Sequence, residues 1–392
     1  MRKAKIGIIG AGHFVRGHHL ETARKSDLME IRAVADIIPE RLNKFTEIAP
    51  IGYTTFDYKK LLDDEEIDIV IIGTKQDLHA KMIVESLDAG KWVYCEKPMS
   101  QNEEESQMVL DAEKRNPGKL AIGFNRRFSP AIQKIRQLMA NEKRPWYIDY
   151  ILMSPALDYN KPGSYYANQP RILYEGCHIL DLLCWMLGTA PSSVYMTGNI
   201  HNNCCIIGFD DGSQVSFTCG STGSWCLYKE MMHIFCDYKS IAMTDFIDLK
   251  IRGFKGEFDK VYPPFEEEYK QDVLKYGYDY WEALTNKRAI EYKDEKYSTE
   301  KYYKQYGIYT EKIKRPVPIP KEPVDYGFSD PEFLVLHPDK GWKNALEHFV
   351  ECFITNQEPE NANGSSGYLS TLLAEKLLES MHTGKPIPIT CD

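Results

Sequence analysis

The chain has 392 residues, of which 43% are hydrophobic and 27% charged, a composition typical of a soluble globular protein and long enough for two domains. Its net charge of −9 argues against a general nucleic-acid binder, which needs a basic face. The ten cysteines are scattered and form no C-x-x-C motif, no stretch resembles a membrane span, and the N-terminus shows no signal-peptide pattern. We therefore expect a cytoplasmic protein with free thiols.

The first 125 residues alternate short apolar runs with helical patterns, as stacked βαβ units do. A helix is predicted from Lys81 to Asp88, ending at Gly90. The runs show little polar alternation, as expected for parallel strands covered on both faces. The predicted strands are Lys5–Ile9, Glu30–Ala35, Asp68–Gly73, Trp92–Cys95 and Leu120–Gly123.

The pattern changes after Phe128, where a helix over Pro130–Met139 is followed by longer, alternating strands from Trp146 onward. Among these strands are Ser193–Tyr195 and beyond, Cys204–Phe209 and Gln214–Cys219. The Asp210-Asp211-Gly212 segment is a hairpin signal between the last two. We predict an α+β domain with a large, mostly antiparallel, open sheet.

The stretch from about residue 255 to 340 is rich in Tyr, Lys, Glu and Pro and shows no clear core strand. It is predicted to be a large, partly helical insertion, whose tyrosines are packing residues or stack on a substrate ring. Two further helices are expected over Asn344–Thr355 and Ser370–His382.

A glycine loop follows the first predicted strand: Gly10-Ala11-Gly12-His13-Phe14-Val15. In a G-x-G-x-x-G/A loop the glycines allow a tight turn and a close approach of a pyrophosphate to the N-terminus of the next helix. The third glycine is replaced by Val15, which weakens the match, and a ligand-free strand–helix turn is the plainer alternative.

Asp36 closes the second strand at the distance expected of a ribose-binding acid. Such an acid accepts both ribose hydroxyls and repels a 2′-phosphate, so NAD is favoured over NADP, although Arg41 lies nearby. We predict an NAD-binding, doubly wound Rossmann domain over residues 1–125. Residues 126–392 are predicted to form a substrate-binding and oligomerisation domain with the insertion and a C-terminal helical region.

Two segments carry candidate chemistry. Glu96-Lys97-Pro98 follows a strand, and strand carboxyl ends are where doubly wound sheets bind ligands. Glu175, His178 and Asp181 recur every three residues at the start of an apolar helix that Gly188 ends, so they share one side of it. The histidines at 18, 19 and 201 lack a metal-ligand pattern, and no metal is expected.

These motifs together resemble the glucose–fructose oxidoreductase / inositol dehydrogenase (Gfo/Idh/MocA) family. The matching segments span most of the chain in the family's order, the insertion excepted. They are the Gly-x-Gly loop, Val34-Ala35-Asp36, Leu78-His79, Glu96-Lys97-Pro98, Gly123-Phe124-Asn125-Arg126-Arg127-Phe128, Gly176-Cys177-His178-x-x-Asp181 and Gly384-Lys385-Pro386.

The resemblance implies that Lys97 and His178 belong to the catalytic group, and Glu175 is the third candidate catalytic residue. Removing a hydride from a secondary alcohol needs a base for the hydroxyl proton. The positive charge of oxidised nicotinamide disfavours protonation of a nearby Lys or His, which would bring the pKa of Lys97 or His178 close to neutral pH. We expect His178 to be the acid/base and Lys97 to polarise the same oxygen. The expected cofactor-binding residues are Gly10, Gly12, His13, Phe14, Asp36, Thr74, His79, Glu96, Lys97 and Asn125, and the expected substrate-binding residues are Arg127, Tyr174 and Asp181.

The chain departs from the family pattern at Tyr174, where an aspartate often stands four residues before the histidine. Glu175 could substitute for it, or could be a substrate ligand or a structural partner of Arg126 or Arg127. Plainer alternatives also remain: Lys97 as a surface lysine, His178 as a core histidine, Asp181 as a structural partner, and His79 as a helix cap.

The leading hypothesis is an NAD-dependent oxidation of a ring hydroxyl of a sugar, polyol or glycoside, with the 3-hydroxyl of a glucoside as one candidate. The alternatives are a redox-neutral glycosidase or epimerase, hydride exchange between sugars through bound NAD, and a nucleotide-sensing regulator without catalysis. The resemblance also implies a homo-oligomer, a dimer or a tetramer.

Overall fold

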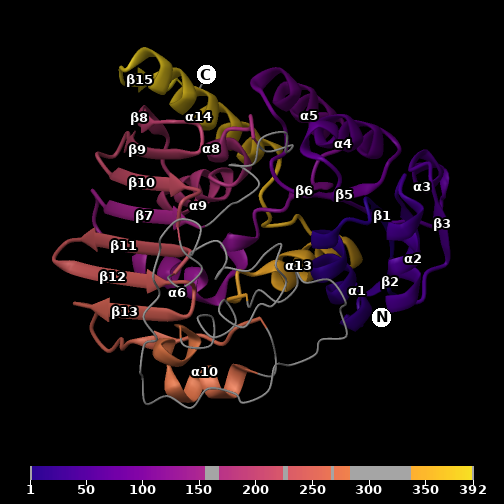
Figure 1. Ribbon diagram of the computed structural model, residues 1–392, viewed down its shortest axis with the longest axis horizontal. Helices are drawn as coiled ribbons and strands as arrows, with labels where there is room; N and C mark the ends of the chain where they lie inside the picture. Colours follow the sequence, from indigo (N-terminus) through magenta and orange to yellow (C-terminus); the bar gives the residue numbers. More distant parts are fainter. Residues whose placement is uncertain (1, 155–166, 224–227, 266–268, 283–336, 391–392) are drawn as a thin grey trace, which may run out of the picture. The chain divides into compact units, whose positions relative to one another are not determined.

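The computed structural model describes residues 2–154, 167–223, 228–265, 269–282 and 337–390. The chain divides into two compact units (Figure 1). The first contains residues 1–129, 172–190 and 341–391, and the second contains residues 130–171 and 191–340. The first unit therefore joins the N-terminal segment to two later pieces of chain.

A six-stranded parallel sheet forms the centre of the first unit, with the order β3-β2-β1-β4-β5-β6. Its strands are β1 (Ala4–Ile9), β2 (Met29–Ala35), β3 (Tyr53–Thr55), β4 (Ile69–Ile72), β5 (Trp92–Cys95) and β6 (Leu120–Ile122). The chain runs outward from β1 to β3 and then returns to β4 beside β1, which is the switch point where doubly wound sheets bind ligands. The Rossmann prediction is confirmed, and β3 is the strand that the sequence pattern did not reveal.

Helices cover both faces of this sheet. The helices of this part of the fold, including short ones that do not lie on the sheet, are η1 (Val15–Leu20, a π-helix), α1 (Glu21–Lys25), α2 (Pro39–Ile48), α3 (Lys59–Asp63), η2 (Gln76–Leu78), α4 (His79–Asp88), α5 (Glu103–Arg115), η3 (Asn125–Phe128), α8 (Arg171–Tyr174), α9 (Cys177–Leu187), α13 (Trp342–Thr355) and α14 (Gly364–Thr383). None of the helices in the described part of the chain is long and apolar enough to cross a membrane.

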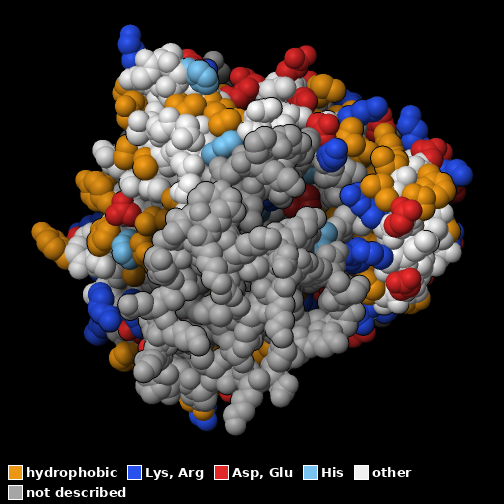
Figure 2. Space-filling model, viewed as in Figure 1, with side chains coloured by type: hydrophobic (Ala, Val, Ile, Leu, Met, Phe, Trp, Pro, Cys, Tyr) orange, Lys and Arg blue, Asp and Glu red, His pale blue; other side chains and the backbone are white. Residues whose placement is uncertain are grey.

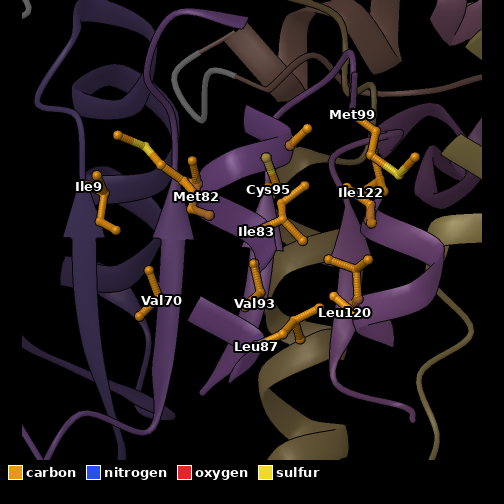
Figure 3. Packing of buried hydrophobic residues seen from close by; sticks show 14 of the residues in the cluster. Ile9, Val70, Met82, Ile83, Leu87, Val93, Cys95, Met99, Leu120 and Ile122 are labelled. Atoms are coloured by element: carbon orange, nitrogen blue, oxygen red, sulfur yellow. The ribbon is translucent and has the colours of Figure 1, made fainter. Parts of the chain in front are cut away.

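Two apolar cores lie on opposite faces of the sheet. On one face, alternate side chains of β4 and β5 such as Val70 and Val93 pack on Ile83 and Leu87 of α4 (Figure 3). On the other face, Ile8, Ile71 and Tyr94 pack on helices that include the distant α13, through Phe349. Burial on both faces explains why these strands lack polar alternation. It also explains why α13 belongs to this unit.

The second unit contains an open sheet with the order β14-β13-β12-β11-β7-β10-β9-β8, in which β7 and β10 are parallel and the other pairs antiparallel. Its strands are β7 (Tyr147–Met153), β8 (Pro191–Gly198), β9 (Asn202–Phe209), β10 (Gln214–Gly220), β11 (Glu230–Cys236), β12 (Lys239–Thr244), β13 (Asp248–Arg252) and β14 (Lys260–Val261). The α+β prediction is confirmed, including the helix α6 (Pro130–Met139) and the hairpin at Gly212. A two-residue strand, β15 (Ile387–Pro388), lies near the C-terminus.

The predicted insertion is described only in part. Before residue 283 it contains the short edge strand β14 and the helix α10 (Lys270–Tyr276), which packs through Val273 against Trp281 and Ile247. Residues 283–336 lie outside the described residues, and so do the predictions made for their tyrosines.

Candidate functional site

The glycine loop turns sharply at the end of β1. Gly10 has φ +95°, and a Cβ there would lie 2.6 Å from the carbonyl oxygen of Gly73, so only glycine fits without strain. Above Gly12, by contrast, a Cβ would meet no atom within 4 Å. The loop thus leaves open space over the second glycine, where the fold expects the pyrophosphate to approach the backbone. The residues present fit a dinucleotide.

The missing third glycine is compensated from the neighbouring strand. A Cβ on Gly73, the residue after β4, would lie 2.1 Å from Cγ2 of Val15. Val15 therefore occupies the space that a side chain at position 73 would take. The third glycine of the motif normally allows the helix to pack closely on the strand. Here the helix side of this contact carries Val15, and the glycine, Gly73, lies on the strand side.

Asp36 is buried at the end of β2 and ties this strand to the glycine loop. Its Oδ2 accepts a hydrogen bond from the Ala11 amide at 2.7 Å, and its Oδ1 accepts one from the Ile38 amide at 2.8 Å. Arg41 lies 3.6 Å from Oδ2 and is half exposed, so the nearby arginine that could have favoured a 2′-phosphate is paired with Asp36. The acid is held where the fold expects the adenosine ribose.

Lys97 follows β5 and reaches the segment before α9. Its Nζ donates to the carbonyl oxygen of Tyr174 at 3.0 Å and to Oε2 of Glu175 at 3.1 Å. The side chains of Lys97 and Glu175 are 18% and 19% exposed, so the pair is open to an incoming molecule without being free in solvent. The structure therefore brings together two of the three predicted catalytic residues, and Glu175 supplies the carboxylate beside the lysine.

The charge on this lysine is stabilised. Burial lowers the pKa of Lys97, but the negative charge of Glu175, with smaller contributions from Cys177 and Glu96, outweighs burial and raises the pKa above its ordinary value. Lys97 is thus a cation at neutral pH when no charged cofactor lies beside it. A shift of the Lys97 pKa down toward neutral pH would therefore have to come from the positive charge of bound oxidised nicotinamide.

His178 lies in the first turn of α9, where its amide donates to the carbonyl oxygen of Glu175 at 3.3 Å. The side chain is buried, 5% exposed, and its ring meets that of Phe124 edge-on at 6.0 Å. The third predicted catalytic residue is therefore one helical turn away from Glu175, on the same short segment of chain.

Arg127 and Asp181 bind each other. The guanidinium donates to both carboxylate oxygens, through Nε to Oδ2 at 2.9 Å and through Nη2 to Oδ1. Burial raises the pKa of Asp181, and Arg127 counteracts this. Arg127 also lies over the Trp185 ring at 5.6 Å, and these residues, with Ser366 and Ser370 of α14, line a hollow of about 350 Å³. Glu175 thus pairs with Lys97, and the partner of Arg127 is Asp181.

The remaining predicted cofactor- and substrate-binding residues range from fully buried to exposed. Tyr174 is 2% exposed and its hydroxyl donates to Oε1 of Gln101 at 3.2 Å, so its ring belongs to the core. Asn125 is likewise buried, whereas Phe14 is exposed on the glycine loop between the partly buried His13 and the helix η1. Thr74 is partly buried at the start of the loop after β4, and its hydroxyl faces Sδ of Met82.

His79 and Glu96 have close partners within the protein. Nδ1 of His79 lies 2.8 Å from the carbonyl oxygen of Pro98, and Nε2 lies 3.3 Å from that of Thr74. His79 is therefore not the cap of α4. The N-cap position is Leu78, which makes no capping hydrogen bond through its side chain. Oε1 of Glu96 lies 2.7 Å from Nε2 of His19, a contact that the sequence pattern did not indicate. Among the described residues, no group of three His, Cys, Asp or Glu side chains could hold a metal ion.

The comparisons with known proteins agree with this geometry. Residues 4–124 match the model of the Gfo/Idh/MocA family, described as an oxidoreductase family with an NAD-binding Rossmann fold. The uncharacterized oxidoreductase YrbE of Bacillus subtilis is 31% identical over 194 residues, which is 49% of this chain and 56% of YrbE. Inositol 2-dehydrogenase of Salmonella typhimurium is 29% identical over 186 residues, 47% of this chain and 54% of that protein. The chain thus aligns with about half the length of these curated relatives.

Solved structures share the fold over nearly the whole chain. Myo-inositol dehydrogenase from Lactobacillus casei, in complex with NAD(H) and myo-inositol, has a TM-score of 0.70 at 13% identity and covers 100% of this chain and 98% of its own. The WlbA dehydrogenase from Bordetella pertussis, in complex with NADH and UDP-GlcNAcA, has a TM-score of 0.68 at 16% identity and covers 100% and 99%.

The fold and the glycine loop define the class of domain: an NAD-binding Rossmann domain. Residues 4–124 match the model of the Gfo/Idh/MocA oxidoreductase family, so the resemblance drawn from the sequence motifs is confirmed over this domain. NAD is the cofactor of this domain.

Proposed function

We propose that the protein is an NAD(H)-dependent dehydrogenase that oxidises a ring hydroxyl of a sugar, polyol or glycoside, with Lys97, Glu175 and His178 as its catalytic residues. The observation that carries the proposal is the Lys97–Glu175 pair, which lies at the carboxyl end of β5 and one helical turn before His178. This is the edge of a doubly wound sheet where ligands bind. The inositol dehydrogenases among the relatives favour a polyhydroxylated ring as substrate.

When bound, NAD supplies the hydride acceptor. Gly10 and Gly12 would hold its pyrophosphate and Asp36 its adenosine ribose. Lys97, a cation held by Glu175, would donate a hydrogen bond to the substrate oxygen and stabilise negative charge as the hydroxyl proton leaves. His178 would accept that proton, and buried surroundings limit competing exchange with water.

A panel of inositols, free monosaccharides and glucosides tests the proposal. Purified protein and excess NAD are mixed with each compound, and the absorbance of reduced nicotinamide is followed. A continuing rise with one class identifies a dehydrogenase and its substrate class, and activity confined to inositols or free monosaccharides would refute the glucoside assignment. A rise that stops at one equivalent per site would instead support the redox-neutral glycosidase or epimerase, because its cofactor is recycled internally.

We further infer that the protein forms a homo-oligomer through the open face of the second unit's sheet. Phe235 of β11 pairs directly with Tyr147 of β7, and they are 43% and 52% exposed; Ile206 of β9 is 48% exposed on the same sheet. In Figure 2 hydrophobic side chains, interspersed with charged and other polar ones, lie at the left of the view, where the strands of this sheet are drawn in Figure 1. An apolar sheet face of this kind fits a second copy of the chain. Light scattering should show a dimer or tetramer that F235E/Y147E dissociates, and a monomeric wild type would refute the inference.

A further inference from the structure

The loop that carries Lys97 is held on both sides by a buried histidine. On one side, Nε2 of His19 lies 2.7 Å from Oε1 of Glu96, the residue before Lys97. On the other, Nδ1 of His79 lies 2.8 Å from the carbonyl oxygen of Pro98, the residue after it. Both histidines are 1% exposed, so neither contact is weakened by competition with water.

The two histidines come from separate helices of the Rossmann domain. His19 lies on η1, which begins at the glycine loop, and it is 77 residues from Glu96 in the sequence. His79 begins α4, the helix that follows β4. The loop after β5, which contains Glu96, Lys97 and Pro98, is thus bonded to the segments that follow β1 and β4, the two strands at the switch point of the sheet. The segment after β1 begins with the predicted pyrophosphate-binding loop.

The donors can be assigned from chemistry. Burial lowers the pKa of His79, which therefore carries a single ring proton at neutral pH. Since both ring nitrogens of His79 face carbonyl oxygens, the proton belongs to Nδ1, whose contact with Pro98 is 2.8 Å against 3.3 Å for the other. Nε2 of His19 donates to a carboxylate, which also accepts the Lys97 amide at 3.3 Å through its other oxygen.

We propose that His19 and His79 are positioning residues, which hold the backbone on either side of Lys97 so that its ammonium meets Glu175 and the Tyr174 carbonyl. Neither histidine takes a proton from the substrate. The effect of these two residues on catalysis rests on the function proposed above, but their role in positioning Lys97 does not depend on that function. The reason for two ties is geometric: a flexible lysine side chain keeps a bound partner at 3.1 Å only if its own backbone is fixed, and errors of about 1 Å at such a group are costly.

Competitive acetylation of Lys97 tests the proposal without any substrate. The rate of labelling by acetic anhydride is measured against pH, with mass spectrometry of the Lys97 peptide as the readout and ADP-ribose binding as a check of the fold. H19L and H79L each remove one hydrogen bond. The amide nitrogen of Gln stands where Nε2 of His stands and that of Asn where Nδ1 stands, so H19Q and H79N each restore the matching donor.

In the wild type, Glu175 keeps Lys97 charged and slow to react. We expect H19L and H79L to release Lys97 from Glu175, lower its titration midpoint by about one unit and raise its labelling rate at pH 8 roughly tenfold. H19Q and H79N should return both values toward the wild type. The matched control is L20A, which removes a fully buried side chain from the same helix as His19 and should lower the melting temperature without moving the Lys97 midpoint.

Two outcomes would overturn the proposal. Leucine variants that keep the wild-type midpoint would show that the ties do not place Lys97, and glutamine and asparagine variants that label like the leucines would show that the donor atoms are irrelevant. Because the readout needs neither turnover nor a known substrate, failure of the dehydrogenase assignment would leave this result intact. If a substrate is found, the leucine variants should lose kcat, and H19Q and H79N should recover part of it.

Discussion

Replacing Glu175 with Gln tests the role assigned to Lys97. Gln keeps an oxygen within reach of the Lys97 ammonium but removes the charge that raises its pKa against the effect of burial. An opposite charge within about 4–6 Å shifts a pKa by about 1–3 units, and the low end of this range applies because the pair is partly exposed. Loss of the Glu175 charge should therefore lower the pKa of Lys97 by about one unit, which corresponds to about 1.4 kcal/mol.

The sign of the pH effect follows from this. In the proposed mechanism Lys97 acts in its charged form, so activity should be lost as pH rises through its pKa. In the wild type this loss lies above the ordinary lysine value of 10.5, and in E175Q it should begin about one unit lower. The folding stability that the raised pKa contributes is present below the unfolded value and is lost as pH rises through the folded one.

The assay is a pH profile of kcat/KM for NAD reduction, with acetylation of Lys97 as a substrate-free second measurement. E175D is the matched control, because it keeps the charge and should leave the alkaline limb closer to the wild type. An alkaline limb that stays in place in E175Q, or that moves to higher pH, would refute the reasoning: Glu175 would then not hold the charge on Lys97.

Three further predictions follow from the site. H178N should reduce kcat by about 10²- to 10⁴-fold, as expected for loss of an acid/base, with NAD affinity unchanged by calorimetry; a near-normal kcat would exclude His178 as the base. D36N should weaken NAD binding and narrow the preference for NAD over NADP, and an unchanged ratio of the two dissociation constants would contradict the ribose assignment. G73A should destabilise the fold by about 1–3 kcal/mol through its clash with Val15, and G73A/V15A should recover most of this in chemical denaturation; a purely additive double variant would argue against the compensation.

The elements with a strong local signal could be predicted from the sequence. Trp92–Cys95 and Pro130–Met139 have the predicted bounds, because an uninterrupted apolar run and an amphipathic repeat bounded by Pro identify them locally. β3 was missed because Tyr53-Thr54-Thr55 is a short edge strand with two polar residues. α14 begins six residues earlier than predicted, since its N-cap, Asn363, precedes a stretch of Gly and Ser with little helical pattern.

The site divides in the same way. Lys97, Glu175 and His178 could be singled out as candidates because they belong to short sequence motifs. The resemblance to the family predicted that they form one site. The ties from His19 and His79, and the exchange of bulk between Val15 and Gly73, depend on contacts between separate βαβ units. No local periodicity reports such contacts, so only the three-dimensional structure reveals them.

The central claim is that a hydride moves from a ring carbon of a polyhydroxylated substrate to NAD beside Lys97. The most direct measurement uses inositols, sugars and glucosides deuterated at their ring carbons, mixed with NAD and enzyme at equal concentrations and quenched within one turnover. Mass spectrometry of the cofactor should then detect deuterium on the reduced nicotinamide for one class of compound, and K97A should abolish it. If no compound in any class transfers deuterium to the cofactor, the account is contradicted.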